Sequence, residues 1–207
     1  MLCLFVFFLA MVPSALAASF SADMVTTVDG KSETGKFYIS GPYYRMEIKE
    51  EGKTVLIIVD KEKNLHSILD TETKTFYEMS SDYKMLLSID NFLLSEYIAS
   101  KYGKQIKGLE KINGIVCEKQ VVPSQNYIIW FSNELRFPIK TILFEGKKQR
   151  AVTELKDIKQ GRLSKSLFAI PAGFKKTEDP RTAARHKREA NDNLEKQLPG
   201  LTGVGSD

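Results

Sequence analysis

The chain contains little cysteine and little histidine, with two residues of each among 207. Cys3 lies in an apolar N-terminal segment, so Cys117 alone remains for the body of the chain and an internal disulfide is excluded there. His66 has no cysteine, histidine or carboxylate at the spacing of metal ligands, and His186 lies near the C-terminus. We therefore expect no metal site, and we expect Cys117 to be a small buried apolar residue.

Motifs of the common enzyme classes are also missing from the sequence. The chain has no Gly-x-Ser-x-Gly motif for a hydrolase nucleophile, and no complete phosphate-binding loop that ends in Gly-Lys-Ser or Gly-Lys-Thr. Asp70-Thr71-Glu72 resembles the start of a calcium loop, but the glycine and the final glutamate of such a loop are absent. The sequence thus predicts a protein that is not an enzyme, with no catalytic residue and no cofactor.

Charge is absent from the first eighteen residues, Met1 to Ala18. Their apolar centre and the small residues of Ala15-Leu16-Ala17 are typical of a secretory signal peptide. No lysine or arginine precedes the apolar block, and eighteen residues also lie at the lower limit of a membrane-spanning helix. Pro13 and Ser14 favour cleavage, so we expect residues 1–18 to be a signal peptide, with an uncleaved membrane anchor as the alternative.

Short runs in which apolar and polar residues alternate follow the signal segment, with turn residues between them. Asp29-Gly30, Asn113-Gly114 and Glu145-Gly146 are typical of tight turns between antiparallel strands. The run 55–59 is apolar at every position, which predicts a strand buried on both faces. The expected strands are 20–28, 36–40, 43–49, 55–59, 65–69, 75–79, 106–110, 114–122, 127–131, 139–145 and 151–158.

One segment in the middle of the chain has the apolar spacing of a helix. From residue 81 to residue 103 apolar side chains recur mainly every three or four residues, Asp90 can cap the helix, and Gly103 can end it. We therefore expect one domain, residues 19–176, with a helical insertion at 81–103. Residues 177–207 carry mixed charges and few large apolar residues, which predicts a mobile or weakly helical tail.

The segment Lys36 to Ile48 has the pattern of a hairpin, with Arg45 near the start of its second strand. This segment, and the order of those that follow it, resembles an early hairpin and its successors in the periplasmic lipoprotein carriers of the LolA and LolB-like superfamily. Segments 57–60, 69–70 and 75–77 look like its next two hairpins. Residues 112–117, Trp130, 137–140 and 167–174 are similar to an uncharacterised outer-membrane lipoprotein-sorting-like branch of the same superfamily.

The resemblance implies a mainly β (α+β) fold, in which a strongly curved antiparallel sheet forms an incomplete β-barrel with a helical lid. It implies a periplasmic carrier that holds lipid acyl chains or lipoproteins on the apolar concave face and has at most peripheral contact with a membrane. The mild formal charge of +4 does not indicate a nucleic-acid partner. The alternative is a non-catalytic envelope module that binds a protein partner through its sheet edge or its tail.

The resemblance also indicates candidate site residues. In the carriers an arginine at the position of Arg45 holds the lid closed through helix carbonyls, and the alternative is an exposed arginine that pairs with Glu47. An ordinary packed core is the alternative for the apolar candidates. The expected cavity residues are Phe37, Ile39, Tyr44, Met46, Ile48, Phe92, Leu94 and Ile98.

Overall fold

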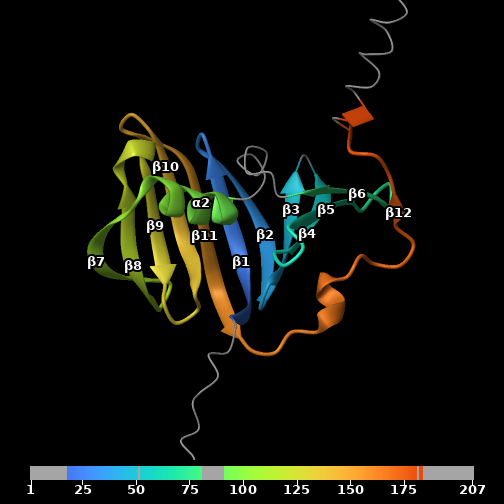
Figure 1. The fold of residues 1–207 in the computed structure, drawn as a ribbon, viewed down its shortest axis with the longest axis horizontal. Coiled ribbons are helices and arrows are strands. Elements are labelled where there is room, and N and C mark those ends of the chain that lie inside the picture. Colours follow the sequence, from blue (N-terminus) through green and yellow to red (C-terminus); the bar gives the residue numbers. More distant parts are fainter. Residues whose placement is uncertain (1–17, 51, 81–90, 181, 184–207) are drawn as a thin grey trace, which may run out of the picture.

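The computed structural model describes residues 18–50, 52–80, 91–180 and 182–183, and most of them form one sheet (Figure 1). The predicted signal peptide therefore lies outside the described residues except for Ala18, as do residues 81–90 of the expected insertion and most of the expected tail. The strands are β1 (Ser19–Val28), β2 (Lys31–Ser40), β3 (Tyr43–Glu50), β4 (Lys53–Asp60), β5 (Leu65–Asp70), β6 (Thr75–Ser80), β7 (Gln105–Ile112), β8 (Ile115–Val122), β9 (Tyr127–Ser132), β10 (Phe137–Glu145), β11 (Lys148–Gln160) and β12 (Lys175–Lys176). The helices are α2 (Asn91–Tyr102) and the short 3-10 helices η1 (Pro123–Gln125) and η2 (Lys165–Phe168).

The sheet consists of two meanders joined in its middle. Its strand order is β12-β6-β5-β4-β3-β2-β1-β11-β10-β9-β8-β7, and all described neighbours are antiparallel except β12 on β6. The pairing of β1 with β11 joins the N-terminal meander to the C-terminal one. The sheet is curved and does not close, and α2 lies across it (Figure 1). The predicted incomplete barrel with a helical lid is confirmed.

The two faces of the sheet have different covers. We call the face that packs against α2 the helix face; Tyr44, Met46 and Ile57 point to it. We call residues 161–174, which connect β11 to β12, the strap. Ile170 and Phe174 of the strap pack on the opposite face, which we call the strap face. Strand β4 is therefore buried from both sides at 56–59, as its continuous apolar run predicts.

An aromatic cluster holds α2 to the helix face. Phe92 of α2 lies with its ring centroid 5.3 Å from that of Phe37 and 5.1 Å from that of Phe137. The rings of Phe20 and Tyr44 extend the cluster across β1 and β3. Aromatic rings bury large apolar areas and prefer such tilted contacts, so this cluster fixes the start of α2 over the middle of the sheet.

The two edges of the sheet differ. On one side β12, which follows the strap, pairs with β6 and covers part of that edge. On the other side β7 is exposed, with Ile106 and Leu109 at 59% and 69% exposure. The register with β8 shifts between these two residues, beside Gly108 at φ +105°. A bulge and lysines such as Lys107 are common means of discouraging aggregation at a free edge.

Most strand predictions are confirmed, and the exceptions have a local cause. Strand β2 begins at Lys31 and not at Lys36, because the tight turn of Asp29 and Gly30 pairs Val28 with Lys31. The five extra residues are exposed or half-buried, so no alternation marks them. The expected helix is found at 91–102 and ends at Gly103, which has a positive φ. Strand β12 was not predicted, since two exposed lysines have no apolar pattern.

Gly35 offers a test of the β2–β3 pairing. A Cβ atom at this position would lie 2.2 Å from the backbone oxygen of Glu47, so Gly35→Ala forces the two strands apart. We expect the free energy of unfolding to fall by about 1–3 kcal/mol, as for other overpacked sites. The matched control is Thr34→Ala, whose side chain is exposed and whose effect should stay within about 0.5 kcal/mol. Urea denaturation measures both, and equal midpoints would contradict the expected clash.

Candidate functional site

A hollow of about 960 Å³ lies on the helix face beside the start of α2. It is lined mainly by aliphatic and aromatic side chains, and its volume lies in the upper part of the range of small-molecule sites. The described lining residues are Met24, Thr26, Val28, Glu33, Met46, Ile48, Val55, Ile57, Ile68, Tyr77, Phe92, Leu94, Leu143, Arg150, Ala151 and Thr153.

Polar groups in the hollow are few. The Thr26 and Thr153 hydroxyl oxygens lie 3.5 Å apart across the β1–β11 pair and form a weak hydrogen bond. Glu33 and Arg150 are exposed, and they lie towards the β1–β2 and β10–β11 turns. The hollow is thus apolar over most of its surface and carries charge at one end. Such a surface can bind an apolar chain without leaving many buried polar groups unpaired.

The eight expected cavity residues fall into two groups. Met46, Ile48, Phe92 and Leu94 line the hollow. The other four are buried in the packed core. Phe37 and Tyr44 belong to the aromatic cluster, Ile39 lies in the same core, and Ile98 packs with Val122, Tyr127 and Ile129. Ligand binding by any of the eight stays a prediction.

Sequence reasoning did not identify the lining residues of β1 and β11. The alternation in 20–28 does place Met24, Thr26 and Val28 on one face, which is the signal that was available. Their neighbours Ala151 and Thr153 come from a strand more than a hundred residues later in the chain. No local pattern shows that these two strands pair, so their shared surface could not be deduced from the sequence.

Arg45 lies on the strap face, on the opposite side of the sheet from α2. Its Nη1 donates a hydrogen bond of 3.3 Å to the carbonyl oxygen of Leu167 in η2, and its Nη2 lies 2.7 Å from a carboxylate oxygen of Glu47. The side chains of Arg45 and Glu47 are only 14% and 27% exposed. The ion pair between Arg45 and Glu47 was the alternative to a lid role that the sequence suggested. Arg45 therefore contacts a carbonyl of the strap, and a role in holding a lid stays a prediction.

His66 is buried on β5, 1% exposed, between Val59 of β4 and Met79 of β6. Burial lowers its pKa to about 4 from the usual 6.5, because the imidazolium ion would lose its hydration. The imidazole is neutral at pH 7 and belongs to the packed sheet. A neutral, buried histidine of this kind contributes to stability more readily than to proton transfer with solvent.

Cys117 is also buried, and no other free cysteine occurs in the described part of the chain. Burial raises the pKa of its thiol to about 11, so the reactive thiolate is scarce at pH 7. Within residues 18–50, 52–80, 91–180 and 182–183 no group of three or more His, Cys, Asp or Glu side chains could hold a metal ion.

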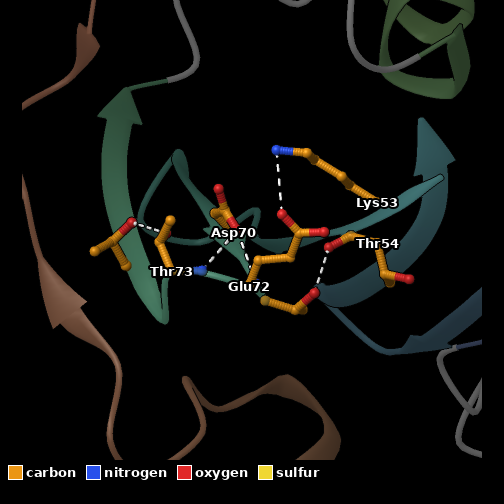
Figure 2. A network of polar contacts seen from close by, with 7 residues as sticks. Lys53, Thr54, Asp70, Glu72 and Thr73 are labelled. Carbon is orange, nitrogen blue, oxygen red and sulfur yellow. Dashed lines mark hydrogen bonds and ion pairs between the residues drawn. The ribbon is translucent and has the colours of Figure 1, made fainter. Parts of the chain in front are cut away.

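The segment that resembles the start of a calcium loop forms an ordinary turn (Figure 2). Asp70 accepts hydrogen bonds from the backbone amides of Glu72 and Thr73 at 2.8 and 3.1 Å. The amides of Thr73 and Glu72 hold the pKa of the Asp70 carboxyl below its usual range. Glu72 pairs with Lys53 at 3.1 Å on the neighbouring hairpin. These carboxylates stabilise the turn between β5 and β6 and link it to β4.

Comparisons with known proteins establish the fold alone. No protein-family model matches the chain, and no curated protein matches it significantly. An uncharacterised conserved protein from Thermus thermophilus matches in structure with a TM-score of 0.58 and 11% identity, over 80% of this chain and 93% of that one. MucB matches with a TM-score of 0.50 and 14% identity, over 76% of this chain and 59% of that one.

Matches with lower TM-scores also occur among the solved structures. A LolA superfamily protein from Nitrosomonas europaea matches with a TM-score of 0.37 and 10% identity, over 74% of this chain and 90% of that one. MucB has also been solved in complex with MucA. No described helix of this chain is long and apolar enough to cross a membrane.

Replacing Arg45 tests its contact with the strap. We expect Arg45→Leu to lower the free energy of unfolding by about 1–3 kcal/mol, because Glu47 and the Leu167 carbonyl lose a charged donor. Hydrogen exchange of the η2 amides should also become faster. Lys49→Leu is the matched control, an exposed cation on the same strand and face, and its effect should be small. Unchanged stability together with altered ligand release would instead favour a lid role.

His66 predicts a specific acid sensitivity. Its pKa is lower in the folded protein than in the unfolded chain, so the unfolded chain binds more protons between pH 6.5 and about 4. The stability contributed by neutral His66 is complete above pH 6.5 and falls as the pH drops, by at most about 3 kcal/mol. The free energy of unfolding, measured at pH 7.5 and 4.5, should fall less for His66→Gln than for the native chain. Parallel losses would contradict this assignment.

Proposed function

We propose that this protein is a carrier-like binding protein that holds an apolar chain, from a lipid or a lipoprotein, in the hollow on the helix face. The observation that supports this proposal is the hollow itself, about 960 Å³ in volume and mainly apolar, between the start of α2 and the curved sheet. A sheet that only packs on a helix has no need of such a space. The binding function requires no catalytic group and no cofactor.

The energy available in the hollow fits an acyl chain. Burying a methylene group contributes about 0.8 kcal/mol, so ten buried methylenes contribute roughly 8 kcal/mol. Association and ordering of the chain offset part of this gain. Micromolar binding needs about 8 kcal/mol in total, so a long chain that is largely buried is required. This favours acyl chains over small apolar molecules as ligands.

The compartment that suits the proposal is the periplasm, where apolar chains must cross an aqueous space between two membranes. The expected signal peptide at residues 1–18 supports export. An exported carrier needs no nucleotide, and at most it touches a membrane surface when it loads or releases its ligand.

A second candidate function is binding of a protein partner along β7. The observation that favours it is the exposure of Ile106 and Leu109 on β7, at the edge of the sheet, and of Val116 on the adjacent strand β8. Exposed apolar residues and unpaired strand groups at an edge are a common site for a partner strand. In that function the hollow would stay unoccupied in the purified protein.

Two neighbouring threonines provide a matched test of the hollow. Thr26 lines it, and Thr27 lies on the opposite face of the same strand. Each hydroxyl pairs with one across the sheet, Thr26 with Thr153 and Thr27 with Ser32. We expect Thr26→Phe to fill the hollow and weaken binding of the neutral fluorophore N-phenyl-1-naphthylamine about tenfold or more, whereas Thr27→Phe should change it less than about twofold.

Mass spectrometry of lipid extracted from the same proteins extends this test. Bound acyl lipid should be present in the native protein and in Thr27→Phe, and it should be reduced in Thr26→Phe. Absence of both bound lipid and fluorophore binding in the native protein would contradict the carrier proposal. In that case Leu109→Glu, which alters β7 and not the hollow, tests the second candidate function through loss of partner binding.

A further inference from the structure

A second cavity, of about 810 Å³, lies at the other end of the strands from the hollow. Its walls come from the start of β1, the β2–β3 turn, the β9–β10 turn, the end of β11 and the strap. The described lining residues of β1 and β11 are Ser19 and Gln160, whereas the hollow uses residues 24–28 and 150–153 of the same strands. The two cavities therefore share no described lining residue.

One wall of the second cavity is apolar. The rings of Tyr43 and Phe168 lie 6.3 Å apart between centroids, with Tyr43 on β3 and Phe168 in η2. Pro42 and the buried Leu135 add aliphatic surface beside them. Half-buried aromatic rings at a cavity wall leave apolar surface for a ligand to cover.

The charged groups of this cavity are mainly cationic. Arg162 and Lys165 line it, and within the described part of the chain neither has a carboxylate partner. Glu134 also lines it, and its carboxylate accepts a hydrogen bond of 2.8 Å from the side-chain amide of Gln160. The lining thus carries two cations and one carboxylate, which leaves a net positive charge for an anionic group to neutralise.

Hydrogen bonds hold the walls in place without a ligand. The Ser19 hydroxyl donates to the Gly161 carbonyl at 2.7 Å, and the Gly161 amide donates to the Ser19 carbonyl at 3.1 Å. The Gly41 amide donates to the Ala18 carbonyl at 2.9 Å. Arg45 holds η2 through Leu167. A cavity that is already formed loses less conformational entropy when it binds.

We propose that the second cavity binds an anionic amphiphile, with its carboxylate or phosphate head on Arg162 and Lys165 and its apolar part against Tyr43 and Phe168. Guanidinium and ammonium groups bind such oxyanions through charge-assisted hydrogen bonds. The site is separate from the hollow and goes beyond the function proposed for it. The phosphate head of an amphiphile and free inorganic phosphate present the same oxyanion to Arg162 and Lys165. The comparison ligands below distinguish these two sources.

The test uses dodecyl phosphate below its micelle concentration, with inorganic phosphate and neutral dodecyl maltoside as comparison ligands, in titration calorimetry. We expect dodecyl phosphate to bind at least about tenfold more tightly than either comparison ligand. Arg162→Glu and Lys165→Glu should each weaken it about tenfold, and Phe168→Ala should weaken it as well. Lys107→Glu makes the same charge change on exposed β7 and should have an effect below about twofold.

Three outcomes would overturn the proposal. One is unchanged binding of dodecyl phosphate to the Arg162→Glu and Lys165→Glu variants, once circular dichroism has verified that both variants are folded. Another is equal affinity for inorganic phosphate, which would indicate a simple anion site. The third is loss of binding in Thr26→Phe, which would place the ligand in the hollow. Binding of N-phenyl-1-naphthylamine should be the same in Arg162→Glu and in the native protein, so failure of one site does not imply failure of the other.

Discussion

The pairing of β1 with β11 is the interaction on which the rest of the structure depends. It joins segments far apart in the chain, as in the Ser19 contact with Gly161 across 142 residues, and without it the two meanders would have no common sheet. The same pairing brings Thr26 opposite Thr153 in the hollow. Both cavities thus require a long-range contact that forms against a substantial loop-closure entropy.

Along β1 the two cavities are separated by the aromatic cluster. Ser19 borders the second cavity, Phe20 belongs to the cluster, and Met24 begins the hollow. The cluster fixes α2 over one part of the helix face, and the hollow lies beside the start of this helix. The strap covers the other face of β4 and β5 through Ile170 and Phe174, so the hairpins are stabilised without filling the helix face. A curved sheet, a helix anchored at the aromatic cluster and a separate cover on the opposite face together leave the hollow among the described residues.

The sequence predicted the parts of this fold that have a local cause. Alternation predicted the strands, the Asp29-Gly30 pair predicted a tight turn, and the helical spacing predicted α2. Alternation also placed Tyr44, Met46 and Ile48 on one face of their strand, but it did not fix that α2 packs on this face. Which residues of this face are packed and which line the hollow depends on where α2 crosses the strands, so it could not be predicted locally. Phe37 packs against Phe92 of α2 and Tyr44 packs against Phe37, whereas Met46 lines the hollow. The strap, the β1–β11 register and hence the second cavity have no signature in the local pattern.

Arg45 connects these features in a way that its position in the sequence did not indicate. Its guanidinium group reaches the Leu167 carbonyl, and the same short helix carries Lys165 and Phe168, which line the second cavity. Its neighbours on β3, Tyr44 and Met46, point to the opposite face, where the aromatic cluster and the hollow lie. A single strand therefore supports the hollow through one set of side chains and the strap through the other. Because adjacent side chains on a strand alternate between faces, β3 can contribute to both cavities without joining them.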